Sequence, residues 1–109
     1  MADIVSITSL NPVLRDTQLA AAGAVTDGVW IEVSGFAHIS VHIEITALAT
    51  AKIHVSNNAV QPLNSVHELE AFSTRLSKFV VIDTPVRWIK TRVSAWTSGT
   101  VSAWLEATT

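Results

Sequence analysis

The feature that most constrains this chain is the alternation of apolar and polar residues in its last quarter. From Trp88 to Trp96, aliphatic residues and a threonine occupy one parity, while tryptophan, lysine, arginine and serine occupy the other. A period of two is typical of a β-strand with one buried face. The same alternation resumes after Gly99 and continues to Ala107. The sequence therefore predicts two successive strands in this region.

The residues between these two strands predict how they pair. Thr97-Ser98-Gly99 is typical of a three-residue hairpin loop in which the glycine takes a positive φ. In that register Arg92 lies opposite Trp104. A two-residue loop would mix the two faces, because a slip of one residue turns every side chain over. The outer face of the predicted hairpin carries three tryptophans and two basic residues: Trp88, Lys90, Arg92, Trp96 and Trp104.

Shorter segments with the same period run through the rest of the chain. The clearest is 38–46, where isoleucine and valine alternate with polar residues, and we expect further strands at 29–33, 51–56, 67–72 and 76–83. The apolar run Phe79-Val80-Val81-Ile82 is consistent with a central strand. Turn-forming residues separate the segments, and no amphipathic helix of useful length occurs. The predicted fold class is all-β, an antiparallel two-sheet β-sandwich or jelly roll. An immunoglobulin-like arrangement is an alternative subclass, without the disulfide of antibody domains.

Length and composition indicate one small domain with two parts. A chain of 109 residues can bury a single core. Residues 1–28 differ from the rest, with a short strand expected around Ile4 to Ile7 and then an irregular, alanine-rich connection that could form an arm on a neighbour. Residues 29–109 are expected to form the sandwich core.

The composition favours assembly with other subunits. Hydrophobic residues make up 49% of the chain, the mean hydropathy is +0.39, and only 15% of residues are charged against a usual share of about 25%. A small monomer has difficulty hiding so much apolar surface, whereas an assembly buries part of it between subunits. The alternative is a well-packed monomer that exposes many alanines and threonines.

Charge and motif content argue against several functional classes. A net charge of −2 and a pI near 6.0 are not those of a nucleic-acid-binding module. The chain has no cysteine, so it can form neither disulfides nor thiolate metal sites. The first residues lack the basic region of a secretory signal, and no apolar run reaches the ~18 residues of a membrane helix. We expect no direct contact with nucleic acid or membrane.

Histidines provide the one candidate metal site. If residues 46–50 form a tight hairpin, His42 lies opposite His54 and Glu44 opposite Lys52, with His38 on the same face. Such a cluster could bind a transition metal. More often these residues form only the polar face of a strand, so no metal and no other cofactor is expected. At a subunit boundary, the same histidines would gain charge in mild acid and weaken the contact.

Enzymatic activity is not expected. The chain has no Gly-x-Ser-x-Gly elbow and no glycine-rich phosphate loop. Glu68 and Glu70 share one strand face, but we interpret them as solvated charges on an edge strand, where they discourage unwanted pairing.

The predicted tryptophan face has three interpretations. Trp88, Arg92, Trp96 and Trp104 are the residue types enriched at protein interfaces, and we predict an interface there. Alternatively, the opposite sheet or the N-terminal segment covers the face, or the aromatic rings stack on sugars. Arg92 could also stack as a cation on Trp104 and stiffen the hairpin.

The closing sequence resembles a known group of proteins. Pro85-Val-Arg-Trp-Ile-Lys-Thr-Arg-Val-Ser-Ala-Trp-Thr-Ser-Gly-Thr-Val-Ser-Ala-Trp-Leu105, after the Phe79 to Ile82 strand, is similar to the ending of small all-β virion proteins of tailed bacteriophages. The resemblance covers about a quarter of the chain. It implies a capsid decoration or cement subunit without catalytic residues. Such a subunit is made in the host cytoplasm, forms homo-oligomers, with a trimer favoured, and bridges major capsid proteins on the capsid surface.

A carbohydrate-binding or receptor-binding β-sandwich of a phage tail or fibre is the alternative function. A lectin is expected to place aspartate and asparagine beside its aromatic rings, for sugar hydroxyls or calcium. The predicted outer face of the hairpin offers mainly lysine, arginine, serine and threonine instead. The sequence therefore favours an assembly role.

Overall fold

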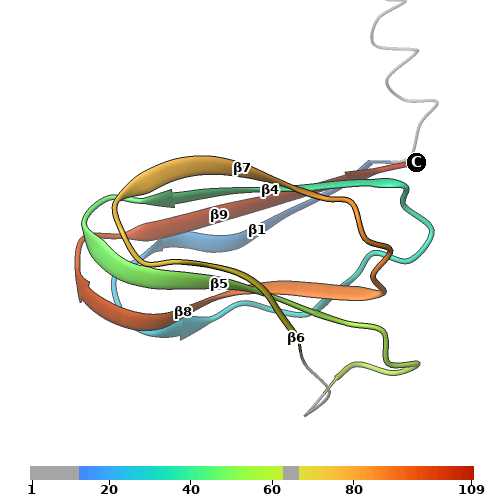
Figure 1. Cartoon of the computed structure of the whole chain (residues 1–109), viewed down its shortest axis with the longest axis horizontal. Coiled ribbons are helices and arrows are strands. Elements are labelled where there is room, and N and C mark those ends of the chain that lie inside the picture. Colours follow the sequence, from blue (N-terminus) through green and yellow to red (C-terminus); the bar gives the residue numbers. More distant parts are fainter. Residues whose placement is uncertain (1–12, 63–66) are drawn as a thin grey trace, which may run out of the picture.

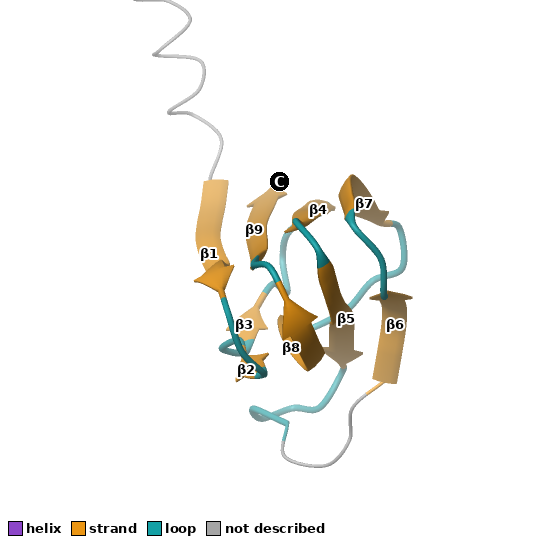
Figure 2. Ribbon diagram, turned by 90° about the vertical axis from the view of Figure 1, so that its left-hand side faces the viewer, coloured by secondary structure: helices purple, strands orange, loops and turns teal. Residues whose placement is uncertain are grey.

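The computed structural model describes residues 13–62 and 67–109, which form two antiparallel β-sheets packed face to face (Figures 1 and 2). Sheet A has the strand order β1 (Val13–Ala22), β9 (Val101–Thr108), β4 (His38–Ile45) and β7 (Leu76–Ile82). Sheet B has the order β2 (Thr26–Asp27), β8 (Trp88–Ser98), β5 (Leu48–Ser56) and β6 (His67–Phe72), and β3 (Ile31–Glu32) also pairs with β8. The predicted all-β, two-sheet sandwich is confirmed. None of the described residues forms a helix, so none supplies a helix that could cross a membrane.

The core consists of the inward-facing residues of both sheets. On the central strands these residues follow the predicted period of two, which is confirmed for β4, β5 and the first half of β8. The largest completely buried side chains are aliphatic apart from one threonine: Val33, Val41, Ile43, Ile45, Ile53, Ile89, Thr91, Val93 and Val101. Burial of these side chains away from water is the main favourable term in folding such a domain.

The connection between β8 and β9 is not a hairpin. β8 pairs with β5, β2 and β3 in sheet B, whereas β9 pairs with β1 and β4 in sheet A. The chain therefore crosses from one sheet to the other at Gly99, and the predicted pairing of Arg92 with Trp104 is wrong. Alternation shows which side chains face the core, but two strands facing each other across the core have the same pattern as two neighbours in one sheet.

The connection between β4 and β5 crosses between the sheets in the same way, and the two crossings are bonded to each other. The backbone N–H of Thr100 donates to Thr46 Oγ1 at 2.8 Å, and the N–H of Thr46 donates to the Thr100 carbonyl at 3.0 Å. Gly99 has a φ of +82°, as predicted, and a Cβ there would lie 2.6 Å from the Ala47 Cβ. Glycine is thus required at this position both by backbone conformation and by space.

Several strand predictions near the sheet edges need correction. The segment expected to be an irregular connection contains β1, and Leu19 is a buried core residue of that strand. The strand expected around Ile4 to Ile7 lies outside the described residues. β7 is an edge strand and not a central one, because it lies at the end of sheet A, and its Phe79 and Val81 face outward and are 67% and 66% exposed. β6 is an edge strand, as predicted for the segment with Glu68 and Glu70.

A glutamine side chain joins the two sheets beside β8. Gln18 Oε1 accepts the backbone N–H of Thr91 at 2.9 Å, and Gln18 Nε2 donates to the Val29 carbonyl at 3.1 Å and to Asp16 Oδ2 at 2.6 Å. Gly28 approaches so closely that an added Cβ would overlap the Thr91 carbonyl oxygen. The side chain from sheet A therefore satisfies a buried donor of sheet B between β2 and β3.

Candidate functional site

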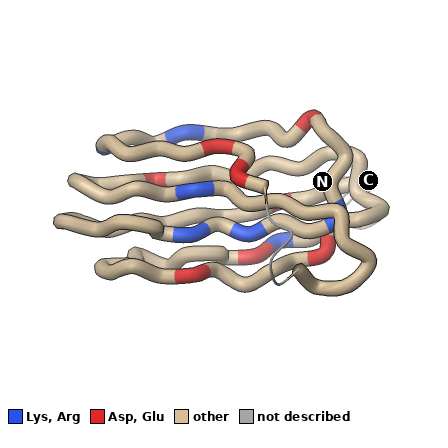
Figure 3. The backbone as a smooth tube through the Cα atoms, turned by 60° about the horizontal axis from the view of Figure 1, so that its bottom comes forward, with Lys and Arg blue, Asp and Glu red and all other residues tan. Residues whose placement is uncertain are grey.

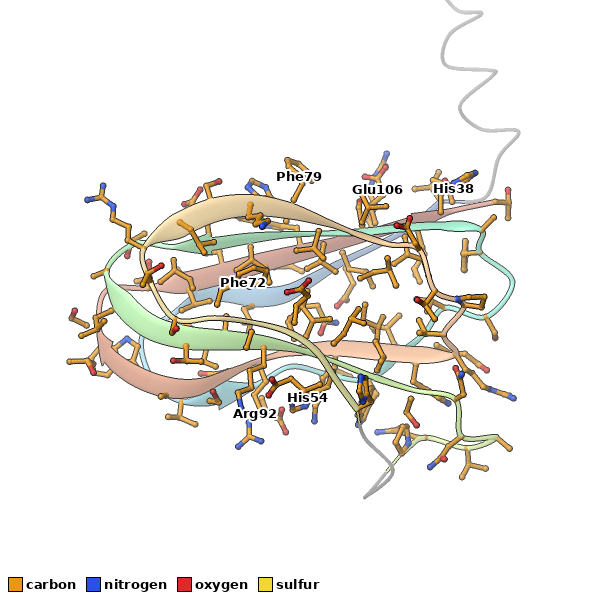
Figure 4. All side chains as sticks on the ribbon, viewed as in Figure 1. His38, His54, Phe72, Phe79, Arg92 and Glu106 are labelled. Atoms are coloured by element: carbon orange, nitrogen blue, oxygen red, sulfur yellow. The ribbon has the colours of Figure 1, made fainter. Side chains whose placement is uncertain are left out.

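The four residues predicted to form one interface do not share a face. Trp88 and Arg92 lie on the outer side of sheet B, Trp96 lies near its end, and Trp104 lies on the outer side of sheet A. Figure 4 shows Arg92 on one outer side of the sandwich and Phe79 and Glu106 on the other. The prediction of a common face is wrong because β8 and β9 belong to different sheets. That each residue contacts another subunit stays a prediction.

Two of the tryptophans make bonds within the chain. Trp88 is half-buried, and its Nε1 donates to the Asn58 carbonyl at 3.0 Å. Trp96 is 40% exposed, and its Nε1 donates to the Gly99 carbonyl at 2.9 Å, across the turn. Both side chains hold loops in place. The predicted stacking of Arg92 on Trp104 does not occur, and the cation–ring contact on sheet B is that of Lys90 with Trp30, at 4.8 Å from the ring centroid.

The outer face of sheet B is charged and several of its charges are paired. Its cross-strand ion pairs are Lys90–Asp27 at 3.0 Å, Lys52–Glu68 at 2.8 Å and Arg87–Glu32 at 2.8 Å. Figure 3 shows the same interleaving of basic and acidic positions on neighbouring strands. In each pair at least one side chain is more than 40% exposed, and surface pairs contribute little stability, about 0–1 kcal/mol each. We interpret this face as a solvated surface.

Two pKa values on sheet B follow from this charge distribution. A hydrogen bond from Lys52 holds the pKa of Glu68 below its usual value. Partial burial lowers the pKa of His54, and the positive charges of Lys90 and Arg92 lower it further. His54 is therefore held in its neutral form to a lower pH than a free histidine.

The predicted histidine pair is not formed. His42 faces outward from sheet A and His54 from sheet B, because the chain crosses between the sheets after β4. Glu44 lies beside Ser77 and Ser102, not beside Lys52. In the part of the chain that the structure describes, no group of three or more histidine, aspartate or glutamate side chains could hold a metal ion. The tight hairpin on which a two-histidine site depended does not form.

A ladder of three rings crosses the outer face of sheet A. His42 on β4 stacks on Phe79 of β7, with centroids 4.4 Å apart and an angle of 13°, and lies 5.1 Å from Trp104 of β9. His42 Nε2 is 2.9 Å from Ser77 Oγ, which fixes the ring. Phe79 is 67% and Trp104 40% exposed. We call Trp104, His42 and Phe79 the ring ladder.

The contact between His42 and Ser77 also resembles the first contact of a hydrolase dyad. A triad needs a third group that orients the histidine through its other nitrogen. No such bond to His42 occurs among residues 13–62 and 67–109, so the pair lacks the orienting group.

A groove of about 470 Å³ runs beside the ring ladder. Its lining comes from all four strands of sheet A and combines the rings with polar side chains: Arg15, Asp16, Thr17, Ser40, His42, Phe79, Trp104, Leu105 and Glu106. Arg15 Nε lies 3.2 Å from Glu106 Oε2, and both side chains are more than half exposed. The small side chain of Ser40 leaves room for the groove between its larger neighbours.

Sequence reasoning singled out Trp104 and His42, for other roles, but missed the rest of this groove. Its residues lie on four strands that are distant in the sequence, and only the order of the strands brings them together. One signal was available: Val80 and Ile82 share the parity of the core, which leaves Phe79 and Val81 on the outer side.

Comparisons with known proteins identify the fold. No protein-family model matches the sequence, and no curated protein matches it. The solved structure of the SPBc2 prophage-derived protein YomS is similar, with a TM-score of 0.70 and 13% identity over 91% of this chain and 95% of that one. The PBSX exported protein XepA is similar with a TM-score of 0.71 and 18% identity over 91% of this chain. This chain spans 38% of the length of XepA.

Proposed function

We propose that this chain is a non-enzymatic structural protein of a phage particle, more specifically a decoration or cement subunit on the capsid surface. The observation that most supports the proposal is the fold similarity to a prophage-derived protein, which extends over 91% of this chain and 95% of the other. The closing sequence, similar to that of small phage virion proteins, supports it independently. Crossing of the chain between its two sheets is also common in jelly-roll domains of viral capsids.

The surface proposed for contact with the shell is the arch end of the sandwich, where the chain crosses between β4 and β5 and between β8 and β9. Val25 is 58%, Leu48 53% and Trp96 40% exposed. These residues adjoin or belong to β2, β5 and β8, which are neighbours in sheet B. We call Val25, Leu48 and Trp96 the arch-end patch. Exposed apolar residues grouped in this way are typical of binding surfaces.

This assignment retains Trp96 from the predicted interface and replaces Trp88, Arg92 and Trp104. Trp88 already packs under the Asn58 loop, and Arg92 lies among the paired charges of sheet B. Burial of the arch-end patch between copies of this chain and the major capsid protein would stabilise the shell, because apolar surface leaves water on assembly. A homo-trimer is the proposed form of the subunit.

The proposal is tested by the protein content of purified particles. Particles are isolated from a strain that carries the gene, and their proteins are quantified by mass spectrometry. We expect this chain in amounts comparable to the major capsid protein, on heads without tails. Its absence from particles, or its presence in tails alone, would contradict the proposal.

A pair of substitutions tests the surface. Val25→Ser with Leu48→Ser is expected to give a folded protein that no longer attaches to heads. The control is Val60→Ser, since Val60 is 72% exposed but lies outside the patch. Normal attachment of the double variant would rule out the arch-end patch as the contact.

A further inference from the structure

We propose that the groove on the outer face of sheet A is a binding site for a neutral oligosaccharide. The ring ladder forms its apolar wall, and Arg15, Ser40 and Glu106 supply the polar groups. This inference does not depend on the proposed place of the protein in a phage particle. The groove and the arch-end patch occupy different surfaces, so a subunit attached through the patch leaves the groove open.

The ring ladder provides exposed aromatic surface of the kind that a sugar ring requires. Phe79 stacks on His42 from one side and has most of its surface exposed at the edge of sheet A. The faces of aromatic rings are electron-rich and attract the C–H groups on one side of a pyranose ring. The stacking on His42 and the hydrogen bond between His42 and Ser77 hold the wall in one position. Such preorganisation reduces the entropy lost on binding.

Polar side chains beside the rings match the hydroxyl groups of a sugar. Glu106 offers carboxylate acceptors, Arg15 offers several N–H donors in a plane, and Ser40 both donates and accepts. The exposed Arg15–Glu106 pair can exchange its contacts with water for contacts with a diol at small cost, because such a pair contributes little by itself.

The absence of carboxylates beside the aromatic rings was the sequence feature that argued against sugar binding. That argument rested on the predicted hairpin, in which the neighbours of Trp104 come from residues 88–96. In the folded protein its neighbours on the groove come from β1 and β4, and Glu106, on the same face of β9, lines the groove with them, whereas the Asp16 carboxylate bonds to Gln18. The structure therefore adds the guanidinium of Arg15 and the hydroxyl groups of Thr17 and Ser40 to the surroundings of Trp104.

The charge of the groove favours a neutral ligand. Its titratable residues are one guanidinium, Arg15, two carboxylates, Asp16 and Glu106, and His42. The Asp16 carboxylate accepts a hydrogen bond from Gln18, and Arg15 is paired with Glu106, so the groove offers an anionic saccharide no unpaired guanidinium.

The size of the groove fits more than one sugar unit. The volume of about 470 Å³ is within the usual range of small-molecule sites. A second depression of about 290 Å³ shares Ser40 and Glu106 with the first and continues past His38 and Val81. A chain of sugars can thus extend over the outer face of sheet A.

Binding is tested with the purified protein by isothermal titration calorimetry. The probes are neutral hexasaccharides of glucose, mannose, xylose and N-acetylglucosamine, with hexagalacturonic acid as the anionic comparison. We expect binding of at least one neutral probe, accompanied by a change in tryptophan fluorescence from Trp104. Phe79→Ala and Trp104→Ala should each lower the affinity by about tenfold or more, which corresponds to about 1.4 kcal/mol.

The matched control is Trp96→Ala, which removes a tryptophan that is also 40% exposed but lies outside the groove. Circular dichroism checks the fold of each variant. Phe79→Ala is expected to fold normally because that side chain is mainly exposed, so a loss of affinity in this variant reports on binding. The proposal is overturned if no neutral probe binds, if the anionic probe binds best, or if Phe79→Ala leaves the affinity unchanged. Loss of self-association in Phe79→Ala without loss of sugar binding would instead assign the rings to a contact between copies.

Discussion

At the scale of single residues, the Gln18 side chain supplies the hydrogen-bond acceptor that a neighbouring strand would supply to Thr91 if β2 and β3 were continuous. Its amide oxygen accepts the buried N–H of Thr91, and its nitrogen bonds the Val29 carbonyl. Gln18→Leu keeps the approximate size of the side chain but leaves the Thr91 donor without a partner. We expect a loss of about 1–3 kcal/mol in the free energy of unfolding, measured with urea. Gln61→Leu, at an exposed position, is the control and should change stability little.

His54 links stability to pH. Burial and the charges of Lys90 and Arg92 lower its pKa in the folded chain, so the unfolded chain binds the proton more readily. The free energy of unfolding should therefore fall as the pH is lowered below the ordinary histidine pKa of 6.5. Urea unfolding between about pH 7.5 and pH 5 measures this effect. His54→Gln should reduce the slope, and an unchanged slope would show that other groups cause it.

At the scale of elements, the crossing between β8 and β9 decides which residues are neighbours. Ser102 has Glu44 as its partner on β4, whereas the hairpin predicted from the sequence pairs it with Ser94. The chain has no cysteine, so engineered disulfides report this arrangement without background. Glu44→Cys with Ser102→Cys should form a disulfide under mild oxidation, because neighbouring antiparallel positions have suitable spacing. Ser94→Cys with Ser102→Cys should not form one. A disulfide in that variant would show that β8 and β9 pair as a hairpin.

At the scale of the whole molecule, the two outer faces differ in chemistry and the arch end differs from both. Sheet B carries paired charges, sheet A carries the ring ladder, and the arch-end patch is apolar. A molecule built this way can attach through one surface and present another.

Self-association is predicted to depend on the arch-end patch. Light scattering of the purified protein should give a mass about three times the 11.7 kDa of one chain. Val25→Ser with Leu48→Ser should give a folded monomer, because the apolar contact is lost. Phe79→Ser should leave the mass unchanged, since Phe79 is as exposed as these residues but belongs to the ring ladder. A monomeric wild-type protein would disprove the trimer.

The sequence by itself determined the fold class and the inward residues of the central strands. Ile39, Val41 and Ile43 were identified correctly because the period of two arises from local backbone geometry, which each strand carries in its own residues. The positive φ of Gly99 was predictable for the same reason.

Only the tertiary structure decided which strands are neighbours. A hairpin and a crossing between sheets bury the same parity of side chains, so alternation cannot distinguish them. The choice depends on contacts between distant segments, such as the bonds of Thr46 to Thr100 and of Gln18 to Thr91. For that reason Trp104 could be recognised as an outward-facing residue, whereas its place beside Phe79 in the ring ladder could not.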